Sequence, residues 1–267
     1  MLGHTRNHNL AQGGFTLVEI SIVLVIIALV AGVVLTGQSL IADATIRATI
    51  NQISQYRTAV TVFRSKYNGF PGDLTNTRAL NLGLSPRVAG RNSDRLLLTG
   101  SNWSPSQCSE ANLFWNDLST LGLIEGRYTG TDTSYGTCGN VSPRDLMPVL
   151  KSNTNVFVIA YSDLTENQNY FTFYSGITAI GVWGTYTGVG AAFTPMQAYS
   201  IDSKIDDGTP FGGQVTARYN GDSATNPLST PAAPANGVCV SNATGNPYNT
   251  KSASGGDFVS CVIRIPM

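Results

Sequence analysis

The chain has 267 residues, a formal net charge of zero, 42% hydrophobic residues and only 12% charged residues. Soluble domains carry about 25% charged residues on average, so this surface relies on uncharged Asn, Thr, Ser and Gly, which suits an exported protein. Without a basic excess, no bulk electrostatic attraction to nucleic acid is expected. The length suffices for one domain with a core plus an extended element.

Histidine is confined to the extreme N-terminus. His4 and His8 are the only two, so a chain that loses this stretch has none, which excludes Ser-His-Asp and Cys-His catalysis and His-ligated metal sites. The sequence also lacks a Walker-type G-x-x-x-x-G-K, a G-x-G-x-x-G after a strand and a G-x-S-x-G. We therefore expect a non-enzymatic protein without an organic cofactor.

Residues 15–35 form an apolar run, FTLVEISIVLVIIALVAGVVL, whose only charge is Glu19. As a helix rising about 1.5 Å per residue, the run would be roughly 30 Å long, one hydrocarbon thickness. The basic leader contains Arg6 and ends in Gly13-Gly14 before the run, and no A-x-A site follows it. Both features argue against an ordinary secretory signal, whose small-residue cleavage site follows its apolar segment.

Glu19 is costly in such a segment, because inserting a carboxylate into the bilayer costs about 2.5–3.5 kcal/mol even on the mild translocon scale. Cleavage after Gly14 would create an α-amino group at Phe15 that could pair with it. Glu19 also lies in the first turn of the predicted helix, where the helix dipole favours an anion. If the amine belongs to a neighbouring subunit, its pairing with the Glu19 carboxylate would favour association of the two subunits.

Gly14-Phe15-Thr16-Leu17-Val18-Glu19 followed by a long apolar run resembles the class III signal of type IV prepilins and type II secretion pseudopilins. The resemblance implies that a prepilin peptidase cuts between Gly14 and Phe15 and methylates the new Phe15 amine. It also implies that Glu19 neutralises a neighbouring subunit's N-terminus during assembly. The implied partners are the peptidase, other pilin or pseudopilin subunits, an inner-membrane assembly platform and the lipid bilayer, with no nucleic acid.

The same resemblance implies a location in the bacterial inner membrane. The chain would cross it once, with a cytoplasmic N-terminus and a periplasmic head, before entering a pilus or pseudopilus.

The helix is predicted to continue beyond the membrane. Apolar side chains recur at three- and four-residue steps, which is the amphipathic pattern: Ile46, Ile50, Ile53, Tyr56, Val60, Phe63 and Tyr67. Asn68-Gly69 and Pro71 predict its end. One helix over 15–67 would be roughly 80 Å long. The expected division is a leader 1–14, a transmembrane half 15–36, an amphipathic half 37–67 and a head 68–267.

The head is predicted to be α+β. Residues 70–110 are rich in Pro, Gly, Asn and Ser, residues 111–124 form an amphipathic pattern, and 222–237 read as a surface loop. Runs typical of antiparallel strands follow: 156–161, 170–174, 177–183, 214–219 and 257–265. A pilin-like fold, in which the long helix packs on an antiparallel sheet, is therefore expected.

Four cysteines lie in the head, at Cys108, Cys138, Cys239 and Cys261. None forms C-x-x-C, and an even number in an exported domain favours two disulfides over four reduced, buried thiols. Of the three pairings, we predict Cys108–Cys138 and Cys239–Cys261, which close the shortest loops. The second pair resembles the disulfide-closed C-terminal region of many type IV pilins.

Asp202, Asp206 and Asp207 are clustered in IDSKIDDGTP. Clustered carboxylates could hold Ca²⁺, as several pseudopilins do in their heads. The spacing does not match an EF-hand loop, and the chemistry of a helix end and an Asp-Gly turn explains the cluster as well.

Three functions remain open at this point. The leading hypothesis is a major or minor subunit of a type IV pilus-like filament, and the sequence does not distinguish adhesion, motility, DNA uptake and secretion. The mature chain would exceed the length of a typical major subunit, which keeps a minor one open. The alternative is a pseudopilin that moves exoproteins through a type II secretion system. Outside this class, a single-pass anchored periplasmic binding or catalytic domain would need neither Glu19 nor the Gly14-Phe15 junction.

Overall fold

The computed structural model describes residues 14–85, 91–97, 110–129, 142–163, 166–180, 186–187, 189–219, 239–241, 247–250 and 259–267. The predicted loop 222–237, Cys108 and Cys138 lie outside these residues. Contacts divide the chain into two compact units, Met1–Thr45 and Ile46–Met267. Each unit is described by itself below, and the second is called the head.

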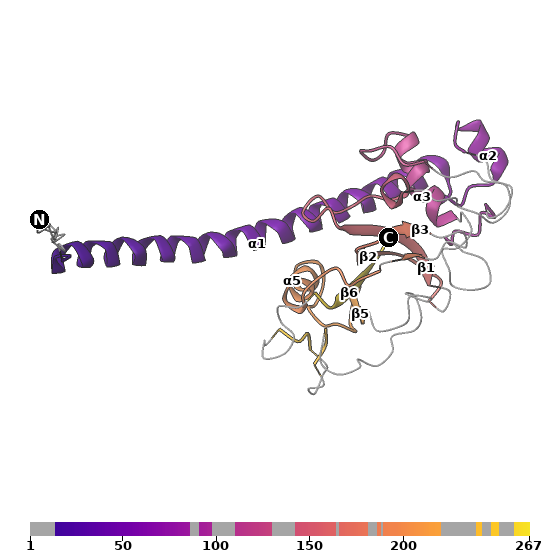
Figure 1. Ribbon diagram of the computed structural model, residues 1–267. Coiled ribbons are helices and arrows are strands. Elements are labelled where there is room, and N and C mark those ends of the chain that lie inside the picture. Colours follow the sequence, from indigo (N-terminus) through magenta and orange to yellow (C-terminus); the bar gives the residue numbers. More distant parts are fainter. Residues whose placement is uncertain are drawn as a thin grey trace, which may run out of the picture. The chain divides into compact units, whose positions relative to one another are not determined.

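The long predicted helix is present as α1 (Leu17–Tyr67), drawn in indigo to purple in Figure 1. It ends where Asn68 takes a left-handed conformation with φ 46°. The Asn68 N–H donates to the Arg64 carbonyl at 2.9 Å, which completes the last turn. Arg64 and Lys66 also lie in that turn, where cations are favoured by the helix dipole.

The second part of α1 packs its apolar side into the head. All residues of the predicted stripe are buried or half-buried, with Ile53, Val60 and Phe63 at most 1% exposed. Gln52 is a polar residue outside the apolar stripe, yet it is buried. Its amide donates to the Val149 carbonyl at 2.9 Å and accepts from the Lys151 N–H at 2.8 Å, which makes its burial tolerable.

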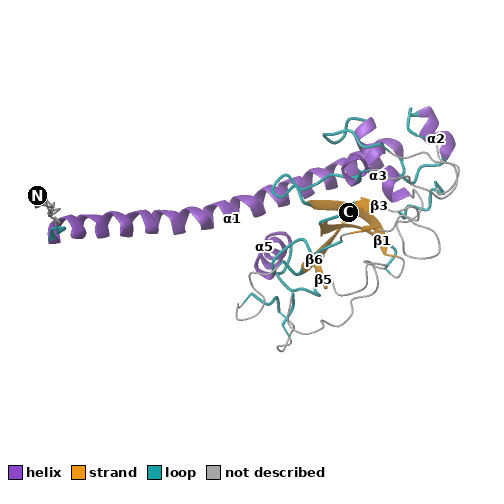
Figure 2. Cartoon of the chain, viewed as in Figure 1, coloured by secondary structure: helices purple, strands orange, loops and turns teal. Residues whose placement is uncertain are grey.

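The head contains a four-stranded antiparallel sheet in the order β1-β2-β6-β5. Its strands are β1 (Val156–Asp163), β2 (Gln168–Ser175), β6 (Cys261–Pro266) and β5 (Thr216–Tyr219). Figure 2 draws the strands in orange. A second pair joins β3 (Ala179–Ile180) to β4 (Tyr186–Thr187). Of the predicted strand 177–183, the structure describes residues 177–180, and β3 is formed by Ala179 and Ile180. A long apolar helix followed by an antiparallel sheet confirms the α+β, pilin-like layout.

The two faces of the sheet have different chemistry because side chains alternate along each strand. Phe171 of β2 contacts Tyr56 of α1 and stacks on Trp115 of α3 (Glu110–Thr120), with ring centroids 6.1 and 5.8 Å apart. On the opposite face, Thr172 lies beside Arg264 of β6. The apolar face thus receives α1 and α3, which also run beside the sheet in Figure 1.

Three helices were not predicted: α2 (Asn76–Asn81), α4 (Pro143–Leu146) and α5 (Pro195–Ile205). Helix α5 had a readable signal, because Thr194-Pro195 and Gln197 form a capping box with proline in the first turn. The short helix predicted over 111–124 is present as α3, which ends at Thr120.

Candidate functional site

The start of α1 carries the candidate site, defined here as the N-terminal site, Gly14–Glu19. Thr16 precedes the first helical residue, and its hydroxyl accepts from the Glu19 N–H at 3.2 Å. In return, Oε2 of Glu19 accepts from the Thr16 N–H and from the Thr16 hydroxyl, each at 2.8 Å. This reciprocal arrangement is a capping box, which satisfies N–H groups that the first turn leaves unpaired.

Glu19 keeps one oxygen available for another donor. Both of its hydrogen bonds use Oε2, so Oε1 has no partner among the described residues. Phe15 is 83% exposed, and Gly14 and Glu19 are exposed too. The N-terminal site therefore presents an accessible junction between Gly14 and Phe15 and a carboxylate held in a fixed orientation one helical turn away.

An apolar surface follows the N-terminal site along the first unit. None of the most apolar 18-residue window is buried, and α1 is long and apolar enough to cross a membrane. The large exposed side chains include Leu17, Val18, Ile20, Ile22, Val23, Leu24, Val25, Ile26, Ile27, Leu29, Val30, Val33 and Val34. An apolar surface of this size needs a lipid or protein neighbour, because water solvates it poorly.

Sequence reasoning assigned Glu19 a role in assembly and overlooked Thr16. The signal was present, since Thr-x-x-Glu before an apolar run is a capping-box pattern. Its consequence is that Glu19 has a second, local role as the residue that caps its own helix.

The C-terminal cysteines are bonded to each other in the structure. Cys239 and Cys261 are 5.0 Å apart at their Cα atoms and 22 positions apart in the chain. Cys261 begins β6, and its carbonyl accepts from the Phe193 N–H at 3.1 Å. The bridge therefore fastens the segment at 239 to the sheet. The other predicted pair, Cys108 and Cys138, lies outside the described residues.

The structure brings Asp202, Asp206 and Asp207 together at the end of α5, with one oxygen of each within 4.8 Å of the others. All three also accept local hydrogen bonds. Asp202 accepts from Tyr248 Oη at 2.8 Å, Asp206 accepts from the N–H groups of Gln214 and Val215, and Asp207 accepts from Thr209. Hydrogen bonds within the head thus account for an oxygen of each carboxylate, and calcium binding here stays a prediction.

Asp202 is the buried member of that cluster. Burial raises the pKa of Asp202 to about 6, against the hydrogen bonds from Tyr248 and Gly208, and the negative charges of Asp207 and Asp206 raise it further. The hydrogen bond between Asp207 and Thr209 lowers the pKa of Asp207. The cluster therefore contains one carboxyl that titrates just below neutrality and one that stays ionised.

Comparison with known proteins bears on the N-terminal site alone. Residues 9–35 match the family model described as the prokaryotic N-terminal methylation motif, the prepilin signal, which implies processing by a peptidase and assembly with other pilin subunits. No curated protein and no solved structure matches the chain. The matched residues include Gly14, Phe15 and Glu19 and the apolar part of α1 that the head does not bury. The chain therefore carries the prepilin signal of type IV pilins and pseudopilins.

Proposed function

We propose that this protein is a structural subunit, major or minor, of a type IV pilus-like filament. It is cut between Gly14 and Phe15, methylated at the Phe15 amine and assembled through the apolar part of α1. It resides in the inner membrane as a single-pass protein before assembly, with its head in the periplasm. The observation that carries this proposal is the solitary Glu19 carboxylate, beside the Gly14-Phe15 junction, at the start of an exposed apolar helix surface.

Glu19 has the geometry to serve two partners at once. Its Oε2 is occupied by Thr16, and its Oε1 remains for a donor outside the chain. A charged amine is the donor that best offsets a carboxylate in an apolar setting, because charge-assisted hydrogen bonds are stronger than neutral ones. In the proposed filament, this donor is the N-terminal amine of a neighbouring subunit.

Processing is the first step to test. The mature N-terminus is expected to be N-methylated Phe15, and Gly14→Leu should block cleavage by placing a bulky side chain at the scissile position. Intact-mass measurement of the protein in the membrane fraction gives the N-terminus directly. An N-terminus beyond residue 30 would assign cleavage to an ordinary signal peptidase and would contradict the proposal.

Assembly can be separated from helix capping with three variants. Glu19→Gln keeps a side-chain oxygen for the capping box, which accepts Gln as well as Glu, but removes the charge. Glu19→Ala removes both, and Thr16→Val removes the capping hydroxyl alone. We expect both Glu19 variants to insert into the membrane at least as well as the wild type and to fail in filament incorporation, while Thr16→Val assembles.

The measurement is the ratio of sheared filament subunit to membrane-held subunit, with total abundance as the control. If Glu19→Gln assembles at the wild-type level, charge pairing has no role in this protein. If Thr16→Val fails as completely as Glu19→Ala, the carboxylate acts through capping. Both results would refute the proposed pairing with a neighbouring amine.

A further inference from the structure

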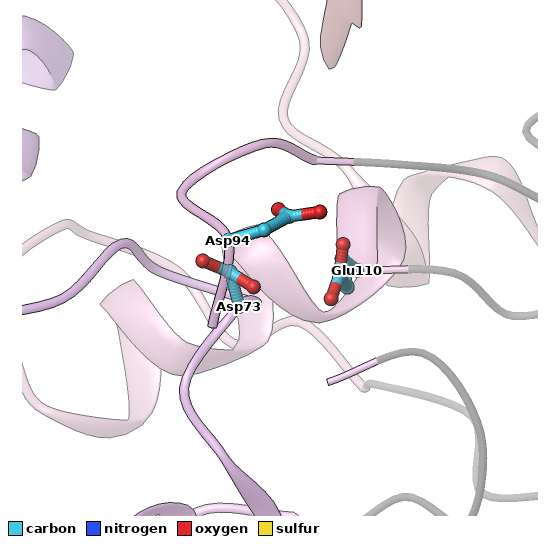
Figure 3. Close-up of side chains that lie close together, drawn as sticks. All are labelled: Asp73, Asp94 and Glu110. Carbon is cyan, nitrogen blue, oxygen red and sulfur yellow. The ribbon is translucent and has the colours of Figure 1, made fainter. Parts of the chain in front are cut away.

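Three carboxylates from separate segments of the head meet beside the first turn of α3 (Figure 3). Asp73 follows α1 by a short turn, Asp94 lies in the segment 91–97, and Glu110 begins α3. One oxygen of each lies within 4.8 Å of the others, and Figure 3 shows the three side chains facing a common space. These residues are called the acidic trio below.

The acidic trio is largely inside the head. Asp73 is 1% exposed and Glu110 is fully buried, whereas Asp94 is exposed and leaves a path from solvent. Like charges so close together, two of them buried, repel one another strongly in a medium of low polarity. A positive charge or a shared proton relieves repulsion of this kind.

Backbone N–H groups of the segment 91–97 bond one oxygen of each member, and the Asn92 side-chain amide also donates to Asp94 Oδ2 at 2.7 Å. The Arg95 N–H donates to Asp73 Oδ2 at 2.6 Å, the Asn92 N–H to Glu110 Oε1 at 3.1 Å, and the Leu96 N–H to Asp94 Oδ1 at 2.8 Å. These bonds fix the carboxylates in place without supplying a charge. Preorganised carboxylates of this kind lower the cost of arranging ligands around an ion.

Asp73 supplies the observation that points to a ligand. Its Oδ1 is buried and has no hydrogen-bond partner among the residues that the structure describes, although buried carboxylate oxygens are almost always satisfied. Asp73 Oδ2 is already bonded to the Arg95 N–H, so Oδ1 is the oxygen of Asp73 that keeps its capacity to bind a ligand. An ion in that space would satisfy it.

Two segments of the chain approach each other closely here, and this approach brings the trio together. Gly72 has φ +82°, and a Cβ atom there would lie 2.2 Å from the Glu110 carbonyl oxygen. Asp117 of α3 accepts from the Gly72 N–H at 2.7 Å and forms a buried pair with Arg91 at 2.7 Å. One α3 carboxylate thus anchors both segments, 72–73 and 91–95, that deliver Asp73 and Asp94.

We propose that the acidic trio binds a calcium ion. Carboxylate oxygens are the ligands that Ca²⁺ prefers, and a set without His or Cys disfavours zinc. Ca²⁺–oxygen distances of about 2.3–2.6 Å place opposite ligands about 5 Å apart, which fits oxygens within 4.8 Å of one another. The site is separate from Asp202, Asp206 and Asp207, and it does not depend on the proposed filament function.

The competing occupant is a proton shared between Asp73 and Glu110, and calcium titration separates the two. The full mature chain, purified in detergent and stripped with a chelator, is unfolded by heat with and without CaCl₂ or MgCl₂. We expect Ca²⁺ at about 100 times its Kd to raise the Tm of the head by about 5–10 °C. Mg²⁺ should act more weakly, because it demands near-ideal octahedral geometry and gives up its waters reluctantly.

Matched variants assign the effect to a site. Asp73→Asn and Glu110→Gln should abolish the calcium-dependent rise in Tm, and Asp94→Asn, at an exposed position, should weaken it while preserving the fold. Asp207→Asn, in the other acidic cluster, should leave the rise unchanged. Metal analysis should find one Ca²⁺ per chain in the Asp207→Asn protein and none in the Asp73→Asn protein.

Two results would overturn the proposal. A stripped wild-type chain whose Tm does not change with Ca²⁺ would assign a shared proton to the trio. A rise that persists in both Asp73→Asn and Asp94→Asn, and disappears in Asp207→Asn, would move the ion to the end of α5. Because the readout is unfolding of the head, neither result bears on filament assembly.

Discussion

Asp202 shows, at the scale of one residue, how burial can make a carboxyl responsive to pH. Its folded-state pKa of about 6 lies above the ordinary value of about 3.9 for an unfolded chain. The folded state therefore binds a proton more readily than the unfolded state does. Its contribution to stability is complete below about pH 4 and is lost as the pH rises through about 6.

We therefore predict that, in the Asp202→Asn variant, the free energy of unfolding of the head depends less on pH between pH 4 and pH 7. With calcium chelated, the wild-type head should lose on the order of 2 kcal/mol between pH 4 and pH 7 through this group. The asparagine variant should lose correspondingly less, because its amide does not ionise. Urea unfolding across that pH range measures the slope, and Asp145→Asn, at an exposed carboxylate, is the control that should leave it unchanged. Parallel slopes for wild type and Asp202→Asn would contradict the prediction.

At the scale of elements, Gln52 joins α1 to the segment before β1. It is buried, and its amide bonds both the Val149 carbonyl and the Lys151 N–H. The same amide donates to the buried Tyr56 hydroxyl at 2.7 Å. Its loss leaves that hydroxyl and the part-buried groups of Val149 and Lys151 without this partner, which costs about 1–3 kcal/mol.

Gln52→Ala should therefore lower the free energy of unfolding of the head by about 1–3 kcal/mol. Gln55, on the same helix and exposed, provides the matched control, and Gln55→Ala should change stability by less than about 0.5 kcal/mol. Denaturant titration followed by tryptophan fluorescence suits this pair, because Trp115 lies in the adjoining core. Equal effects of the two substitutions would show that the buried amide contributes nothing specific.

The bridge between Cys239 and Cys261 should stabilise the head through its unfolded state. Closing a loop with a sequence separation of 22 contributes roughly 3 kcal/mol in the chain-entropy model. The double substitution Cys239→Ser and Cys261→Ser should lower head stability and subunit abundance by a corresponding amount. Membrane insertion should not change, since it depends on residues 15–35.

Peptide mapping under non-reducing conditions tests both predicted disulfides, Cys108–Cys138 and Cys239–Cys261. A linkage of Cys108 with Cys239 would contradict the predicted topology of the last strand, and free thiols throughout would refute the argument from an oxidising compartment.

Elements with a strong hydrophobic period could be predicted from the sequence. Helix α1 ends within one residue of the expected position because Asn68 and Pro71 stop it, and β1 and β2 contain the predicted runs. Helix α5 was not predicted, because it has few apolar residues and the capping box of Thr194 and Gln197 was not recognised in the sequence. The burial of Gln52 could not be predicted locally, since the two backbone groups that it bonds, at Val149 and Lys151, are about 100 positions away.

The two acidic groupings show the same limit. Asp202, Asp206 and Asp207 are close in the sequence, so their proximity could be predicted. Asp73, Asp94 and Glu110 are distant in the sequence and meet only because Gly72 permits close contact with α3. Single-sequence reasoning finds sites formed by a motif and misses sites formed by tertiary packing.

At the scale of the whole molecule, the chain should separate into parts with opposite solubility. A fragment that begins at Thr36 lacks the most apolar part of α1 and keeps more than two turns of helix before Ile46, the first buried residue of the head. We predict that it is soluble and monomeric when secreted into the periplasm. Light scattering or sedimentation gives the mass, and filaments formed by this fragment alone would contradict assembly through the apolar helix.

The uncovered apolar surface of α1 also has a consequence for reversibility. Hydrocarbon tails and the side chains of neighbouring helices are about equally apolar, so moving this helix from bilayer to a helical bundle changes its hydrophobic free energy little. Moving the helix from either environment into water would cost much hydrophobic free energy, whereas moving it between bilayer and bundle costs little. The direction must then be set by small polar terms and by contacts of the head. In the proposed filament, such a subunit would therefore return to the membrane at little hydrophobic cost.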